Sequence, residues 1–189
     1  MSKRDDICDA ALELFAEKGI EATTTRESAE QAGAAEGTLY RHFDGKADLA
    51  QWLYRRCAGE LEAALTRAAE ATANPRERLE ALIRSVFDFY ASKPASCTYL
   101  LSTRESGVVG NEDREGLSPP VRFFAEVLDD GMRQGVFREA TASLVANWIL
   151  AMVQRTVLVL KSGSVPLGER AAIDRTVDAA RRLLAPDVG

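Results

Sequence analysis

Histidine and cysteine are scarce in this sequence, which has one histidine and three cysteines among its 189 residues. The cysteines are Cys8, Cys57 and Cys97, which lie far apart and form no Cys-x-x-Cys pair, and the single histidine is His42. Zinc sites need closely spaced ligands, and a disulfide framework needs paired cysteines. We therefore expect no metal, no disulfide and no other cofactor, and we expect reduced thiols in a cytoplasmic protein.

The residue sets that support catalysis are also missing. The sequence offers no nucleophile–histidine–acid set, no cluster of metal ligands and no glycine-rich phosphate loop. We therefore expect a protein that is not an enzyme.

An excess of positive charge is absent as well. The formal net charge is −5, and acidic residues outnumber Lys and Arg within the first fifty residues. DNA affinity draws heavily on phosphate neutralisation, so any binding to DNA would depend on a few local cations. The amino-terminal residues lack the apolar core of a signal peptide, and Gln154 and Arg155 interrupt the most apolar stretch, Trp148–Leu160. We expect neither a signal peptide nor a membrane span.

Helical periodicity runs along the whole chain, and β-branched residues are sparse outside Val153–Val159. Apolar residues at helical spacing, with capping residues and glycines between the runs, predict an all-α fold of about nine helices. The predicted helices cover about 3–18, 25–33, 36–43, 46–71, 75–93, 95–104, 119–134, 141–161 and 167–184. Residues 106–118 are predicted to form a loop.

Residues 24–43 have the spacing of a helix-turn-helix. Ala29 is small where a second helix would cross the first, Gly33 stands where the chain must turn, and Leu39 would pack the second helix onto the first. In this motif the second helix enters the major groove of DNA. The candidates for contact with phosphates or bases are Thr38, Tyr40, Arg41 and Lys46.

The same region contains LFAEKG at 14–19, Thr24 and Thr25, Ala32 and Gly33, GTLYRHF at 37–43, and Lys46 with Leu49. With these residues, the stretch 11–49 resembles the tetracycline-repressor (TetR-type) family of bacterial regulators. The resemblance implies a homodimer with a three-helix helix-turn-helix DNA-binding head at 1–48 and a helical ligand-binding and dimerisation body at 49–189. Each head would bind half of a palindromic operator in double-stranded DNA, and an unknown small-molecule effector would release it.

Carried over by position, the resemblance implies a set of residues close to DNA. They are Thr25, Arg26, Glu36, Gly37, Thr38, Leu39, Tyr40, Arg41, His42 and Lys46. The sequence departs from the family pattern at Ser28, at Ala34 and Ala35, and at Glu36. Ala35 is a poor N-cap, which costs about 0.5–2 kcal/mol relative to serine. Glu36 stands where a lysine is frequent, and its carboxylate either repels phosphate or accepts a hydrogen bond from a cytosine amine.

Aromatic and arginine residues of the body are candidates for a ligand pocket, although aromatics at helical spacing more often belong to the core. They are Phe87, Tyr90, Tyr99, Arg104, Phe123, Phe124, Trp148 and Arg155. Arg155 could instead face solvent or a partner subunit. The last two predicted helices are apolar on more than one side, which favours a four-helix dimer interface or, alternatively, the core of one chain. The interface candidates are Val145, Ile149, Met152, Ile173, Val177 and Leu184.

The sequence thus predicts a ligand-responsive transcriptional regulator, and more specifically a repressor. An activator is left open. The alternative from another class is a ligand-binding helical protein whose DNA-binding head is weak or vestigial.

Overall fold

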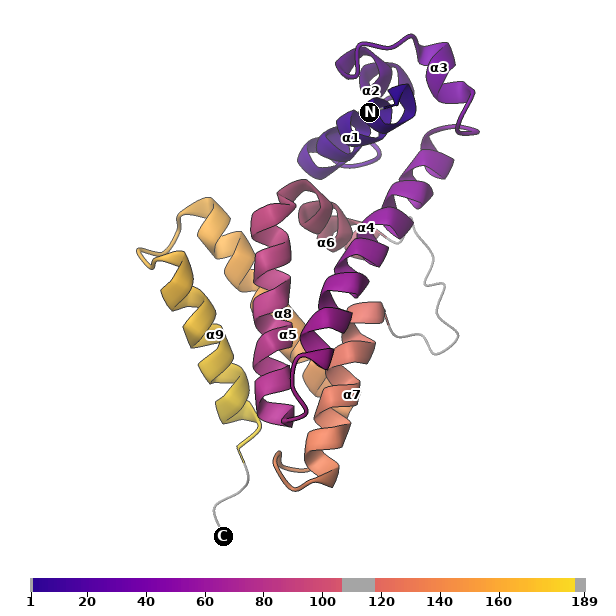
Figure 1. Ribbon diagram of the computed structural model, residues 1–189. Coiled ribbons are helices and arrows are strands. Elements are labelled where there is room, and N and C mark those ends of the chain that lie inside the picture. Colours follow the sequence, from indigo (N-terminus) through magenta and orange to yellow (C-terminus); the bar gives the residue numbers. More distant parts are fainter. Residues whose placement is uncertain (1, 107–117, 186–189) are drawn as a thin grey trace. The chain divides into compact units, whose positions relative to one another are not determined.

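Nine α-helices and no strand make up the part of the chain that the computed structural model describes, residues 2–106 and 118–185 (Figure 1). The helices are α1 (Lys3–Lys18), α2 (Thr25–Gln31), α3 (Glu36–Tyr40), α4 (Lys46–Glu70), α5 (Pro75–Ser92), α6 (Pro94–Ser106), α7 (Pro119–Arg133), α8 (Ala142–Ser162) and α9 (Glu169–Leu183). The predicted all-α fold is confirmed. Apart from its two ends, the loop predicted at 106–118 lies outside the described residues.

The described residues form two compact units. The first comprises residues 2–60 and 92–106, and the second comprises residues 61–91 and 118–185. Helices α1, α2, α3 and α6 belong to the first unit, helices α7, α8 and α9 belong to the second, and α4 contributes to both. The boundary at residue 48 that the sequence predicts between head and body is a functional division, and it remains a prediction.

Helix α1 organises the first unit. Ser2 and Asp5 form the predicted capping box at its start, and Gly19 ends it with a φ of 85°. Its apolar face is fully buried and contacts α2, α3 and α6. The Phe15 ring stacks on Tyr99 of α6 with 5.8 Å between centroids, and the buried Tyr99 hydroxyl donates to the carbonyl of Ala50 in α4 at 2.8 Å. Helix α6 is therefore part of the same core as the amino-terminal helices.

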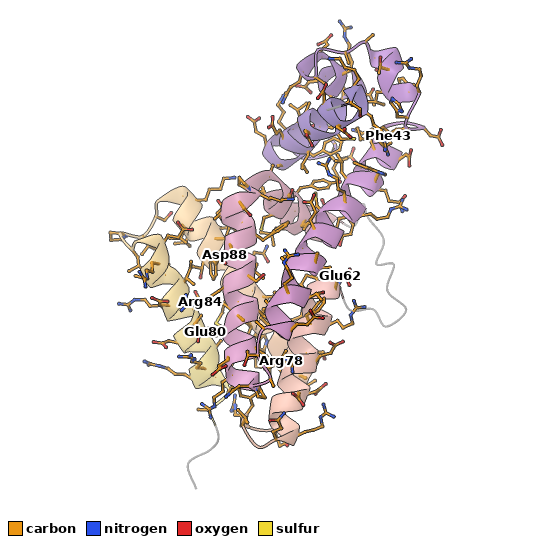
Figure 2. All side chains as sticks on the ribbon, in the orientation of Figure 1. Phe43, Glu62, Arg78, Glu80, Arg84 and Asp88 are labelled. Carbon is orange, nitrogen blue, oxygen red and sulfur yellow. The ribbon has the colours of Figure 1, made fainter. Side chains whose placement is uncertain are left out.

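The second unit is a helical layer structure in which α7 packs against α8, and α8 against α9. An ion-pair network also joins α5 to α9 (Figure 2). The Arg84 guanidinium donates to Glu80 at 2.9 Å and to Asp174 at 2.7 Å, and Arg181 pairs with the other oxygen of Glu80. The hydrogen bonds to Asp174 and Glu80 raise the pKa of Arg84. Because these ion pairs are partly exposed, they contribute little to the free energy of unfolding, and their main effect is to fix the orientation of α9 against α5.

The buried and the exposed residues of α8 differ from those expected from the sequence. Val145 and Ile149, predicted at a dimer interface, are buried inside one chain, whereas Trp148, predicted in a pocket, is 47% exposed. Leu144 and Leu158 are also exposed on the same side as Trp148. Within the described residues, α8 is the one helix whose length and composition would also suit a membrane span.

Candidate nucleic-acid interface

Helix α2 begins with a side-chain cap on its first turn. The Thr24 hydroxyl accepts a hydrogen bond from the backbone N–H of Glu27 at 3.1 Å. The Glu27 carboxylate does not complete a capping box with Thr24, because it pairs instead with Lys18 of α1. That ion pair ties α2 to α1, against which it packs. Gly33 then turns the chain with a φ of 60°, as the sequence predicts.

Helix α3 is short and is held mainly by one side chain. Leu39 has no exposed surface and anchors α3 in the core of the first unit, where Ala29 of α2 is also fully buried. No part of the Leu39 side chain reaches the surface, so only its backbone could approach DNA, and its place among the residues close to DNA stays a prediction. Ala35 supplies no side-chain cap, as predicted, and the helix ends at Tyr40 rather than Phe43.

The outward side of α3 and the residues just after it are exposed. Tyr40 is 54% exposed, and Gly37, Arg41 and His42 are exposed as well. Thr38 is half-buried, and its hydroxyl accepts a 3.4 Å hydrogen bond from Arg41. The structure therefore brings these candidates together on one short segment.

The remaining DNA-contact candidates surround that segment. The Thr25 hydroxyl donates to the Glu36 carboxylate at 2.8 Å and lies 3.4 Å from the Tyr40 hydroxyl. Arg26 is paired with Glu30 of α2 at 2.7 Å. The Lys46 Nζ donates to the carbonyl of Glu21 at 3.0 Å. In this conformation the polar groups that could hold phosphates are engaged with the protein itself.

A cluster of cations and rings that the sequence reasoning missed fastens α1 to the start of α4. The Arg4 guanidinium lies 4.6 Å from the centre of the Trp52 ring and 5.4 Å from that of Phe43, which Figure 2 labels. The Arg56 guanidinium lies 5.3 Å from the centre of the same Trp52 ring and pairs with Asp9 at 2.9 Å. The spacing of Trp52 and Arg56 on one helix was a usable signal, but nothing near Arg4 in the sequence indicates its ring partners.

The candidates for a ligand pocket are distributed over both units. Phe87 and Phe124 are buried in the second unit, where Tyr90 and Phe123 are half-buried, and Tyr99 is buried in the first. Arg155 is exposed on α8 beside the face that carries Trp148. The Arg104 side chain lies outside the described residues. That these residues line one ligand pocket stays a prediction.

A groove of about 380 Å³ lies between α8 and α9 within the second unit. Met152 and Val159 of α8 line it with apolar surface, and Arg155 and Arg175 bring two guanidinium groups to it. Among the interface candidates, Val177 and Leu184 are buried in one chain like Val145 and Ile149, whereas Met152 and Ile173 are half-buried. Met152 is thus an interface candidate that lies in the groove.

Comparison with known proteins places this architecture in a family. Residues 7–52 match the bacterial regulatory proteins of the tetR family, and residues 72–158 match the tetracyclin repressor-like C-terminal domain. The HTH-type transcriptional repressor KstR2 of Rhodococcus jostii is 33% identical over 141 residues, which cover 72% of this chain and 68% of that protein. This chain belongs to the tetR family.

Two further comparisons concern regulators from Bacillus subtilis. The fatty acid metabolism regulator protein of Bacillus subtilis is 26% identical to this tetR-family chain over 157 residues, which cover 80% of the chain and 79% of that protein. The crystal structure of FadR from Bacillus subtilis in complex with stearoyl-CoA has a TM-score of 0.72, 21% identity, and coverage of 98% and 99% of the two chains. The structural likeness supports the fold. The tetR-family protein described here is a DNA-binding transcriptional regulator and not an enzyme.

Proposed function

We propose that this tetR-family protein is a homodimeric, cytoplasmic repressor that binds a palindromic operator and is released from it by a small-molecule ligand. The head at residues 1–48 binds double-stranded DNA, and the body at residues 49–189 provides dimerisation and ligand binding. One observation carries the proposal. Leu39 fixes α3 in the core, so that Gly37, Tyr40, Arg41 and His42 are exposed together on the helix-turn-helix.

The contacts with DNA divide into two kinds. Lys46, Thr25 and Arg26 flank α3, and Tyr40 is its last residue; these cations and hydroxyl groups position a duplex through its phosphates. Thr38 lies on α3 itself and is the residue assigned to base contact. Because the head is acidic overall, affinity depends on these few groups and declines steeply with salt.

Dimerisation is assigned to the exposed face of α8. Leu144 and Trp148 are each 47% exposed and Leu158 is 41% exposed, which is unusual for large apolar side chains that recur on one side of a helix. A second copy of the chain would bury this face about a two-fold axis, and the adjoining groove with Met152 and Arg155 belongs to the same interface. A two-fold pair of heads matches a palindromic site.

The ligand assigned to the body is an acyl-CoA thioester. This assignment is carried over from the FadR structure with stearoyl-CoA and from the relative that regulates fatty acid metabolism. A ligand shifts the protein away from DNA only if it binds the DNA-incompetent state more tightly than the competent one. Stearoyl-CoA should therefore dissociate the protein from its duplex, and free coenzyme A should not.

Selection of bound duplexes from random DNA, repeated at two salt concentrations, tests the function. A two-fold symmetric consensus is expected. Lys46→Glu should weaken binding to every sequence by a similar factor and lower the salt slope by about 1, because it removes a phosphate contact. Thr38→Ala should change which sequences are preferred.

Arg67→Glu is the matched control, since it makes the same charge change at an exposed position of α4. Arg67→Glu should leave the affinity for DNA and the salt slope near the wild-type values. Unchanged binding by Lys46→Glu would show that Lys46 does not contact a phosphate as proposed. Absence of binding by the wild-type protein to any duplex at low salt would refute the function itself.

A further inference from the structure

Three side chains of the head form a directed chain of hydrogen bonds. The Thr25 hydroxyl lies 2.8 Å from Oε1 of Glu36 and 3.4 Å from the Tyr40 hydroxyl. An ionised carboxylate can only accept hydrogen bonds, so Thr25 donates its proton to Glu36. The oxygen of Thr25 is then left as an acceptor, and Tyr40 donates to it. Both hydroxyl protons therefore point along the chain toward Glu36.

These are the protons that a DNA phosphate would need. A phosphate oxygen is also a pure acceptor, so it binds a hydroxyl only when that hydroxyl donates to it. From this geometry we infer that Glu36 sets the affinity of the head for DNA, because it competes with phosphate for the hydroxyl protons of Thr25 and Tyr40. The inference rests on the proposed function, since it concerns the strength of the same interface.

Glu36 forms no ion pair among the described residues, although Arg26 of α2 is near enough to interact with its charge. Other acidic side chains of α2 are neutralised, since Glu27 pairs with Lys18 and Glu30 pairs with Arg26. Within the described residues, no lysine or arginine lies within ion-pair distance of Glu36. Arg26 is already paired with Glu30, so the charge of Glu36 is only partly offset. The remaining negative charge repels a phosphate that approaches α3 and adds to the competition for protons.

Glu36→Gln tests the competition with little change of shape. The glutamine oxygen still accepts from Thr25, but a neutral acceptor holds a hydroxyl less strongly than a carboxylate does. The expected result is about tenfold tighter binding, the size of one hydrogen bond to a charged group. The gain should be equal for a duplex selected by the wild-type protein and for a mixed-sequence duplex, because both present the same phosphates.

Glu17→Gln is the matched control. Glu17 is exposed on α1 of the same unit, so this variant makes the same change of charge away from the hydroxyl chain. It should alter affinity by less than about twofold at the same salt concentration.

A double-mutant cycle with Thr25→Val separates competition for protons from simple repulsion. Valine has the shape of threonine without the hydroxyl, so the chain from Tyr40 to Glu36 is cut. If Glu36 acts through Thr25, most of the tenfold gain from Glu36→Gln disappears in the Thr25→Val background. Thermal unfolding of each variant establishes that the head is folded in every binding measurement.

The outcomes are distinct. An equal gain with and without the Thr25 hydroxyl would overturn the inference in favour of through-space repulsion. A gain confined to one sequence, or a change of preference, would overturn it in favour of base contact by Glu36. If wild-type protein binds a duplex and Glu36→Gln binds no better, only the inference fails. If neither binds any duplex at low salt, the proposed function fails with it.

Discussion

Gly131 lies inside α7, where glycine would ordinarily be a weakness. In a helix interior, glycine is less stable than alanine by about 1 kcal/mol, so Gly→Ala usually stabilises a protein. At this position a Cβ atom would overlap the ring of Phe137, which is buried. The backbone N–H groups of Val136 and Phe137 both donate to the Gly131 carbonyl, at 2.8 and 3.2 Å. The ring is thus held over the glycine by the turn that leads to α8, and Gly131→Ala should destabilise the protein.

The magnitude follows from two opposing effects. Alanine contributes about 1 kcal/mol through helix propensity, whereas an overpacked core typically costs about 1–3 kcal/mol and here must also displace a held ring. The expected net loss is about 1–2 kcal/mol. Gly59 of α4 is the matched control, since a Cβ there would meet nothing within 4 Å. Gly59→Ala should therefore stabilise by about 0.5–1 kcal/mol.

Thermal and urea unfolding followed by far-ultraviolet circular dichroism measures both changes. For a chain of this size, 1 kcal/mol corresponds to a shift of about 2–4 °C in Tm. The two glycine variants should move Tm in opposite directions. In a Phe137→Ala background the ring is gone, and Gly131→Ala should become stabilising. An increase in Tm for Gly131→Ala with the ring in place would refute the packing argument.

Three more predictions concern the body, the head and the cysteines. Trp148→Asp should yield single chains by light scattering while helix content stays unchanged, and a persistent dimer would place the interface elsewhere than the α8 face. Arg4→Met should lower the free energy of unfolding by about 1 kcal/mol, because it removes a cation held near two rings; no change would mean that the contact contributes nothing. Burial raises the pKa of the Cys8 and Cys97 thiols from 9.0 to about 11. The unfolded state then loses these protons first, so the free energy of unfolding should fall as pH rises from 9 to 11, and less so in Cys97→Ala, with a pH-independent value contradicting the assignment.

Helix positions could be predicted from the sequence because capping residues, glycines and prolines mark their ends. Which side of α8 faces the core could not. Apolar residues occur around most of the circumference of this helix, so its hydrophobic pattern does not indicate one buried side. Val145 and Trp148 are both apolar, yet Val145 is buried and Trp148 is exposed. Which side of this helix is buried is decided by α7 and α9, which precede and follow it along the chain, and the periodicity of α8 alone does not show where they pack.

The candidate interface was predictable as a motif but not as a set of contacts. The spacing of Ala29, Gly33 and Leu39 indicates the helix-turn-helix, and the structure has Leu39 as its anchor. The same residue was also expected near DNA, because position along a motif does not distinguish an inward side chain from an outward one. The hydrogen bond between Thr25 and Glu36 joins residues eleven positions apart on two helices, and no local pattern encodes it.

The way α3 is held has a bearing on how this regulator can evolve. Helix α3 has five residues and no side-chain cap, so it depends on Leu39 for its position. Gly37, Arg41 and His42, close to Leu39 in the sequence, are exposed. Exchanges at exposed positions typically alter the free energy of unfolding by less than about 0.5 kcal/mol. New DNA preferences can therefore accumulate around a single fixed leucine, without a compensating mutation elsewhere in the protein.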